Sequence, residues 1–234
     1  MGKLYLIPMT LGDTPLDGVI PRDVQDLCKE IKIFIVENIR TTRRYLKKID
    51  KSIDIDSLCF LELNKHTKKE EISSYLNKIK EGDIGIISEA GCPGVADPGA
   101  DIVEIAHRKN IQVVPLVGPS SILMVVMASG FNGQSFAFNG YIPIKSGERA
   151  KKLNELERIS KQNNQTQVFI EAPYRNIGMF EDIIKTCNKN TMLCIACDIS
   201  TEDEYIKSMS VGEWKKIKPD IFHKRPAIFA IFCK

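Results

Sequence analysis

Short, almost wholly apolar segments alternate with helical segments through the first half of the chain. The apolar segments span residues 4–8, 33–37, 58–63, 84–88 and 111–116, and helices are expected at 21–29, 40–49, 67–80 and 99–109. Strands that are apolar on both faces are typical of a parallel sheet covered by helices on both sides. This pattern therefore predicts an α/β domain built on a mostly parallel sheet.

The second half of the chain has less helix between its strands. Strands are expected at 135–139, 167–171, 192–197, 204–210 and 227–232, with helices at 147–160 and 176–187. Strands that follow one another this closely favour a mixed sheet. A chain of 234 residues is long enough for two small domains. We expect two α/β domains, at residues 1–116 and 117–234.

A loop rich in small residues follows the fourth expected strand, at residues 88–99. It contains three glycines, two prolines and two carboxylates, and it is longer than the usual strand-to-helix connection of about 2–6 residues. Open α/β sheets bind ligands beyond the carboxyl ends of their strands, and glycine lets the backbone approach a ligand closely. We therefore expect this loop to bind a ligand.

Several common ligand and metal motifs are missing. Residues 8–12 (PMTLG) follow the first expected strand in place of the G-x-G-x-x-G of a Rossmann dinucleotide site, and no P-loop occurs. Cys194 and Cys197 form a C-x-x-C without a second pair, and the seven cysteines are scattered along the chain. We expect neither a metal site nor a disulfide framework.

The charge and hydropathy patterns favour a cytoplasmic protein without membrane contact. The N-terminus lacks a signal-peptide pattern. The uncharged stretch 113–131 is interrupted by Pro115, Gly118 and Pro119, so it is interpreted as protein interior. The net charge of +3 permits an RNA partner without requiring one.

Five segments, in order, resemble motifs of the tetrapyrrole methylase superfamily, nearest its ribosomal RNA small subunit methyltransferase I branch. That branch typically reads T-P-I-G-N-L, A-E-D-T-R, S-D-A-G-x-P-x-x-S-D-P-G, P-L-P-G-P-S and E-S-P-H-R. The matching segments here are residues 7–12, 36–40, 88–99, 115–120 and 171–175. The resemblance implies an S-adenosylmethionine-dependent methyltransferase that acts as a homodimer and methylates a ribose 2′-oxygen of ribosomal RNA.

The resemblance also implies a cofactor site in the cleft between the two domains. The first domain would contribute small and polar residues from its strand ends, and the second domain would contribute a helix start and one strand residue. The expected cofactor residues are Pro8, Ser88, Glu89, Ala90, Gly91, Val95, Ala96, Asp97, Ser120, Ser121 and Ala227. Unpaired N–H groups at the helix start near Ser120 could hold the methionine carboxylate.

Glu37 and Arg40 follow the second strand at its carboxyl end and are the candidate catalytic residues. Glu37 could accept the proton of a 2′-hydroxyl or orient that hydroxyl. The alternative, left open by the sequence, is a carboxylate at a helix start that pairs with Arg40.

The residues expected to bind the substrate are Arg43, Arg44, Tyr174 and Arg175. Basic residues crowd the helix after the second strand, which favours an anionic polymer. The chain departs from the branch on the substrate side, with Asn38-Ile39 in place of Asp-Thr and Cys197-Asp198 in place of Arg-Glu. Two alternatives therefore stay open: a C-methyltransferase of tetrapyrrole (precorrin or porphyrin) intermediates, and a cofactor-binding protein without catalysis.

Overall fold

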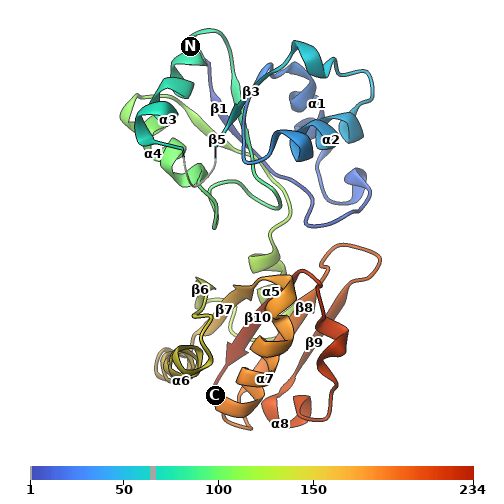
Figure 1. Ribbon diagram of the computed structural model, residues 1–234, viewed down its shortest axis with the longest axis vertical. Coiled ribbons are helices and arrows are strands. Elements are labelled where there is room, and N and C mark those ends of the chain that lie inside the picture. Colours follow the sequence, from blue (N-terminus) through green and yellow to red (C-terminus); the bar gives the residue numbers. More distant parts are fainter. Residues whose placement is uncertain (1, 64–66) are drawn as a thin grey trace. The chain divides into compact units, whose positions relative to one another are not determined.

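Figure 1 shows a computed structural model of the chain, in which residues 2–63 and 67–234 are described. The chain divides into two compact units, Met1–Ser120 and Ser121–Lys234, which we call unit 1 and unit 2. The domain boundary expected after residue 116 stays a prediction.

Unit 1 contains a five-stranded sheet in the order β3-β2-β4-β1-β5, and all neighbouring strands run parallel. The strands are β1 (Leu4–Ile7), β2 (Ile33–Val36), β3 (Cys59–Glu62), β4 (Ile84–Ile87) and β5 (Val113–Pro115). The helices are α1 (Arg22–Glu30), α2 (Ile39–Ile49), α3 (Lys69–Tyr75) and α4 (Gly99–Arg108), with short 3₁₀ helices at Leu16–Gly18, Ile55–Ser57 and Leu76–Lys80. The expected parallel α/β sheet is confirmed.

Alternate residues of the strands pack on opposite faces of this sheet. In β2, Ile33 and Ile35 join a core cluster with α3 and α4, whereas Phe34 and Val36 join a second cluster with α1 and α2. Figure 1 shows the two pairs of helices on opposite sides of the sheet. Because both faces are covered, the strands need apolar residues at every position.

Unit 2 contains a five-stranded mixed sheet in the order β6-β7-β10-β8-β9. Only the β6–β7 pair is parallel, and the other three pairs are antiparallel. The strands are β6 (Phe136–Tyr141), β7 (Thr166–Glu171), β8 (Met192–Cys197), β9 (Tyr205–Ser210) and β10 (Ala227–Phe232). The helices are α5 (Ser121–Ser129), α6 (Ser146–Asn163), α7 (Asn176–Thr186) and α8 (Val211–Trp214), with 3₁₀ helices at Pro173–Arg175 and Pro219–Phe222. The expected mixed sheet is also confirmed.

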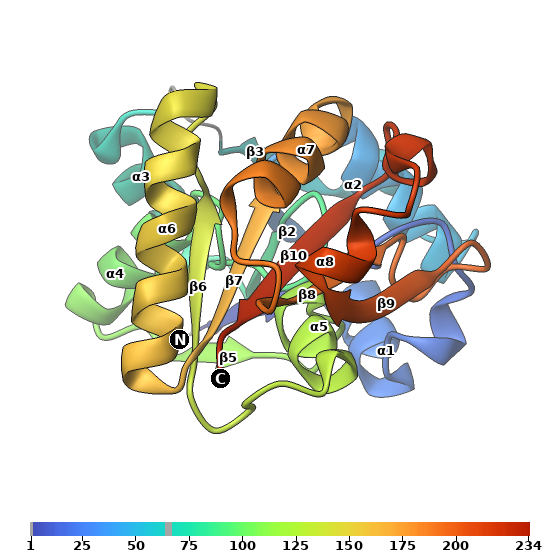
Figure 2. The same ribbon diagram turned by 90° about the horizontal axis from the view of Figure 1, so that it is seen from below.

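The core of unit 2 lies between its sheet and the helices α6, α7 and α8 (Figure 2). Phe169 of β7 and Phe229 of β10 stack at 5.6 Å in this core. The buried Trp214 of α8 donates from its indole nitrogen to the carbonyl oxygen of Leu193 at 2.9 Å. A buried Trp N–H needs such a partner, so the bond fixes α8 against β8.

One expected helix is shorter in the structure. Residues 67–80 were expected to form a single helix, but the α-helical part ends at Tyr75 and continues as a 3₁₀ helix to Lys80. Tightened last turns of this kind are frequent at helix ends. Within residues 2–63 and 67–234, no helix combines the length and apolar character needed to cross a membrane.

Candidate functional site

Two backbone hydrogen bonds join the loops that follow β1 and β4. The amide of Met9 donates to the carbonyl oxygen of Gly91 at 2.8 Å, and the amide of Gly91 donates to the carbonyl oxygen of Met9 at 3.2 Å. Because β1 and β4 are parallel neighbours, both loops leave the same edge of the sheet. The structure thus places two segments expected to bind the cofactor, around Pro8 and around Gly91, side by side.

The carboxylate of Asp97 braces the β4 loop from within. It accepts hydrogen bonds from the backbone amide of Gly94, at 2.9 and 3.0 Å, and from that of Gly99, at 2.6 Å. Gly94 and Ala96 have φ values of +84° and +61°, in the left-handed region that glycine adopts readily. The Asp97 carboxylate is therefore engaged in shaping the loop, and its contact with a cofactor stays a prediction.

The other expected cofactor residues of this loop differ in exposure. Ser88 is buried, and its hydroxyl donates to the carbonyl oxygen of Ala90 at 3.2 Å. Glu89, Ala90 and Val95 are exposed. The surface that the loop offers to a ligand therefore consists mainly of backbone and small side chains, with the exposed carboxylate of Glu89 beside them.

Pro8 is held from two directions. The hydroxyl of Tyr45, on α2, donates to the carbonyl oxygen of Pro8 at 2.8 Å. Gly118 lies so close that a Cβ atom built on it would come within 2.2 Å of the Pro8 Cβ atom. The thiol of Cys92 lies 3.4 Å from the carbonyl oxygen of Pro119 and connects the same turn to the β4 loop. Only glycine at position 118 lets the turn before Ser120 pack in this way.

The candidate base Glu37 is partly buried at the carboxyl end of β2. Burial raises the pKa of its carboxyl group above the ordinary value of 4.5. A hydrogen bond from the backbone of Glu89 lowers this pKa in part, and the nearby charges of Glu89 and Asp97 raise it. The helix start after Glu37 is capped by Asn38, whose side chain accepts from the amides of Arg40 and Thr41 at 2.9 and 3.2 Å. Asn38 therefore serves as the helix cap, and the Glu37 carboxylate instead accepts a hydrogen bond from the backbone of Glu89.

The basic helix α2 borders this edge of the sheet. The hydroxyl of Thr41 lies 3.4 Å from a carboxylate oxygen of Glu89 and connects α2 to the β4 loop. Arg40, Arg43 and Arg44 are all exposed. The guanidinium carbon of Arg43 lies 5.4 Å from the centre of the Phe60 ring, which is a cation–π contact. Within residues 2–63 and 67–234, no hydrogen bond or ion pair engages the Arg43 N–H groups, so they can contact an anion.

In unit 2, three of the expected residues lie around the end of β7. Ala227, the first residue of β10, pairs in register with Glu171, the last residue of β7. Tyr174 and Arg175 follow directly in a 3₁₀ turn, and Arg175 forms an ion pair with Glu171. Ser121, which opens α5, is not part of this group.

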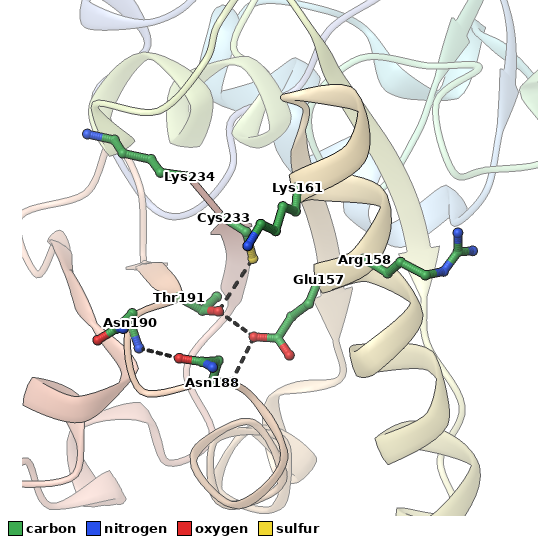
Figure 3. Close-up of a pocket in the computed structure, with 8 residues that line it drawn as sticks. All are labelled: Glu157, Arg158, Lys161, Asn188, Asn190, Thr191, Cys233 and Lys234. Atoms are coloured by element: carbon green, nitrogen blue, oxygen red, sulfur yellow. Dashed lines mark hydrogen bonds between the residues drawn. The ribbon is translucent and has the colours of Figure 1, made fainter.

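A separate recess of about 290 Å³ lies at the other end of β10 (Figure 3). Its centre is occupied by Glu157, which accepts hydrogen bonds from the hydroxyl of Thr191 and from the amide of Asn188 at 2.8 Å. The Thr191 hydroxyl also lies 3.4 Å from the Cys233 sulfur. None of the expected site residues lines this recess.

The edge of unit 1 suits a large ligand that approaches the backbone closely. A Cβ atom at Gly91 would lie 3.3 Å from the Leu11 side chain and 3.5 Å from the carbonyl oxygen of Pro119, and one at Gly118 would collide with Pro8. A Cβ atom at Gly94 would meet no atom within 4 Å. Exposed backbone and small residues of this kind suit a ligand such as the S-adenosylmethionine that the sequence resemblance implies. Among residues 2–63 and 67–234, no cluster of three or more His, Cys, Asp or Glu side chains could hold a metal ion.

The chain belongs to the tetrapyrrole (corrin/porphyrin) methylases, whose family model matches residues 11–215. Its parallel sheet with a glycine-rich loop at the carboxyl edge, followed by a unit with a mixed sheet, is therefore the fold of an α/β methyltransferase that uses S-adenosylmethionine.

Relatives and solved structures agree with this assignment. A ribosomal RNA small subunit methyltransferase I from Buchnera aphidicola subsp. Schizaphis graminum is 30% identical over 98% of this chain and 78% of its own length. The methyltransferase CobJ superposes with a TM-score of 0.65 over the full length of both chains, at 13% identity. A uroporphyrin-III C-methyltransferase from Thermus thermophilus, complexed with S-adenosylhomocysteine, superposes with a TM-score of 0.56 over 99% of this chain and 97% of that one, at 15% identity.

Sequence reasoning missed the residues that support the site. Tyr45 was not predicted to support the site. Its place on an amphipathic helix next to the expected site is the signal that could have identified it. The contacts of Arg149 with Glu171 and Asp182 were not predicted, because no local pattern connects residues so far apart in the sequence. Their contacts arise only when α6, α7 and β7 pack together.

Proposed function

We propose that this enzyme transfers a methyl group to a ribose 2′-oxygen of ribosomal RNA. The observation that carries the proposal is the contact between the β4 loop and the basic helix α2, through Thr41 and Glu89. This contact puts exposed guanidinium groups next to the expected cofactor residues, where the phosphate backbone of an RNA substrate would lie. The curated relative from Buchnera, named as a ribosomal RNA methyltransferase, supports the same substrate class.

The residues of unit 1 supply the functions that such a reaction needs. S-adenosylmethionine supplies an electrophilic methyl group when bound. Glu37 would take or hold the proton of the attacking hydroxyl, and its raised pKa makes the carboxylate a stronger base than an exposed glutamate. Arg40, one helical turn ahead of Arg44, would hold a neighbouring phosphate. The remaining requirement is positioning, which the braced loops after β1 and β4 provide.

The cofactor residues of this proposal are those expected from the sequence. In unit 1 they lie on the β1 and β4 loops and at the turn that ends in Ser120, and in unit 2 they are Ser121 and Ala227. We propose that the cofactor binds between the two domains, with Arg43, Arg44, Tyr174 and Arg175 on the RNA side.

A tetrapyrrole C-methyltransferase is the competing activity, because the solved structures with this fold include such enzymes. The similarity of this chain to those solved structures concerns the fold alone. The exposed arginines of α2 favour a polyanion over a single porphyrin-like acid. A cofactor-binding protein without catalysis is disfavoured by membership in a methyltransferase family.

We also propose that the enzyme is a cytoplasmic homodimer. Leu123 and Met127 on α5 are large apolar side chains that lie 53% and 81% exposed. Exposed apolar side chains on one helix are typical of subunit interfaces. Light scattering coupled to gel filtration measures the mass directly, and a mass near 26.3 kDa, that of one chain, would contradict the dimer.

The decisive test of the activity is a methylation assay with two acceptors. Purified small ribosomal subunits from a strain lacking this gene and a uroporphyrinogen-type tetrapyrrole are incubated separately with the enzyme and isotopically labelled S-adenosylmethionine. We expect label in the RNA, and mass spectrometry of the nucleosides should locate it on a ribose. Label in the tetrapyrrole alone would support the competing activity, and cofactor binding without transfer to either acceptor would support a non-catalytic protein. The Glu37→Gln variant is the matched control for RNA methylation.

A further inference from the structure

Tyr174 presents an aromatic ring to solvent at the end of β7. The residue is 67% exposed and lies in the 3₁₀ turn Pro173–Arg175. One side of the ring is backed by Arg175, whose guanidinium carbon lies 4.9 Å from the ring centre. Arg175 Nη1 also donates to the Tyr174 hydroxyl at 2.6 Å. The ring is thus held by the side chain that follows it in sequence.

Arg175 is held in turn by a buried carboxylate. Its Nε atom donates to Glu171 Oε1 at 2.8 Å, and its Nη2 atom lies 2.5 Å from the same oxygen. Glu171 is only 4% exposed, and the backbone amide of Ala172 also donates to Oε1 at 2.7 Å. The guanidinium of Arg175 is therefore fixed by two contacts with one oxygen of Glu171.

The ion pairs extend from Glu171 to charged residues of α6 and α7. Arg149, which is 4% exposed, lies 3.5 Å from the other oxygen of Glu171 and 2.9 Å from a carboxylate oxygen of Asp182. Arg149 also donates to the carbonyl oxygens of Pro143 and Ile144 at 3.0 and 2.8 Å. The charges of Asp182, Arg149, Glu171 and Arg175 alternate and cancel, so the network has no positive charge left over for a phosphate.

Burying ion pairs is an inefficient way to stabilise a fold, because desolvation offsets most of the attraction. A buried ionic network can instead hold a group in one position. Here its outer end holds an exposed aromatic ring, and such rings bind unpaired bases by stacking. A ring that is already fixed loses less entropy when a base stacks on it. Tyr141, also 62% exposed, lies on β6 opposite Ile170 of the adjacent β7, so a second exposed ring is near.

We infer that the open face of Tyr174 stacks on an unpaired base of the RNA, and that Arg175 is a positioning residue for this ring rather than a phosphate contact. The inference rests on the proposed RNA substrate and narrows it to RNA that contains an unpaired base. Arg149 and Glu171 act through Arg175, since neither touches the ring directly.

The test compares two short single-stranded RNAs that differ only in their bases: an oligouridylate and an abasic oligomer of the same length. We expect the unaltered enzyme to bind the oligouridylate more tightly than the abasic oligomer. Tyr174→Ala should weaken binding of the oligouridylate by roughly 5- to 150-fold and leave binding of the abasic oligomer unchanged. Tyr174→Phe keeps the ring and should bind nearly as the unaltered enzyme does. Phe136→Ala, at the opposite end of the parallel pair β6–β7, removes an exposed aromatic ring elsewhere and serves as the matched control.

Arg175→Gln distinguishes positioning from phosphate contact. A positioning role predicts a smaller difference between the two oligomers and an unchanged salt dependence of binding. A phosphate contact predicts that the slope of log affinity against log salt concentration falls by about one in the variant. That result would overturn the positioning role of Arg175. Equal affinity of the unaltered enzyme for both oligomers, or unaltered binding by Tyr174→Ala, would overturn the stacking role while leaving the RNA substrate in place. Failure to bind either oligomer or the small ribosomal subunit would overturn the proposed function and the inference together.

Discussion

The hydroxyl of Tyr45 donates a 2.8 Å hydrogen bond to the carbonyl oxygen of Pro8, across 37 residues of sequence. Tyr45 is 4% exposed, and Pro8 is buried. The bond joins the basic helix α2 to the first of the loops expected to bind the cofactor. Both the RNA side and the cofactor side of the proposed site therefore depend on it.

Tyr45→Phe should destabilise the fold by about 1–3 kcal/mol, because the Pro8 carbonyl oxygen is left buried without a partner. Affinity for S-adenosylhomocysteine should fall as the β1 loop loosens. Urea denaturation and calorimetric titration measure the two effects. Tyr5→Phe, on β1, removes a hydroxyl that has no hydrogen bond within the described residues and is the matched control. Equal stability of the two variants would contradict the supporting role of Tyr45.

Gly118→Ala should displace the turn from Pro8, because the new Cβ atom would lie 2.2 Å from the Pro8 Cβ atom. Overpacking of this kind costs about 1–3 kcal/mol. We also expect a loss of cofactor affinity of roughly tenfold or more, equivalent to about 1.4 kcal/mol. Gly18→Ala places its Cβ atom in open space and should change neither quantity. Unchanged binding by Gly118→Ala would show that this turn lies outside the cofactor site.

The activity should rise with pH through the pKa of Glu37, which burial holds above the ordinary value of 4.5. Only the ionised carboxylate can accept the proton of the hydroxyl. The pH profile of kcat/KM should therefore show an ascending limb above pH 4.5, and Glu37→Gln should remove it and lower kcat by roughly 10²- to 10⁴-fold. An ascending limb that persists in Glu37→Gln would assign the base to another group.

The contribution of Glu37 to the stability of the fold should change with pH in the direction opposite to the activity. A carboxyl group whose pKa is raised in the folded state stabilises the fold while protonated and loses that contribution as pH rises through the raised pKa. At neutral pH, Glu37→Gln removes a partly buried charge, so we expect its melting temperature to exceed that of the unaltered enzyme. The difference should shrink as pH falls below 4.5. A variant that loses activity together with stability would indicate a structural role.

Reversing the charges of Arg43 and Arg44 to Glu should weaken RNA binding and reduce its salt dependence, because fewer counterions are released. Cofactor affinity should stay nearly the same. Lys32→Glu with Lys80→Glu is the matched control, since both lysines are exposed and precede β2 and β4 at the opposite edge of the same sheet. Similar RNA binding by the two double variants would place the RNA elsewhere.

Treatment with a chelator should leave cofactor binding and melting temperature unchanged, because no group of side chains within the described residues could hold a metal ion. Calorimetric titration with S-adenosylhomocysteine before and after dialysis against EDTA measures this. Recovery of lost affinity on adding a divalent cation would contradict the expectation.

Local sequence patterns were sufficient for the architecture. Apolar runs such as 33–36 require cover on both faces, and the structure provides it with Ile33 and Ile35 on one side and Phe34 and Val36 on the other. The loop at 88–99 could be singled out because its glycines, prolines and carboxylates are contiguous. Strand faces and loop chemistry are local properties, which a single sequence records directly.

Only the tertiary structure decided which distant side chains support the site. Tyr45 reaches Pro8, Gly118 fits against the same proline, and Arg149 joins Glu171 to Asp182 because packed helices and strands bring them together. The structure also shows that Asn38, not Glu37, caps α2, and that Glu171 fixes Arg175. Hydrogen bonds and ion pairs act over a few ångströms in space, and sequence spacing does not specify which residues folding brings within that range.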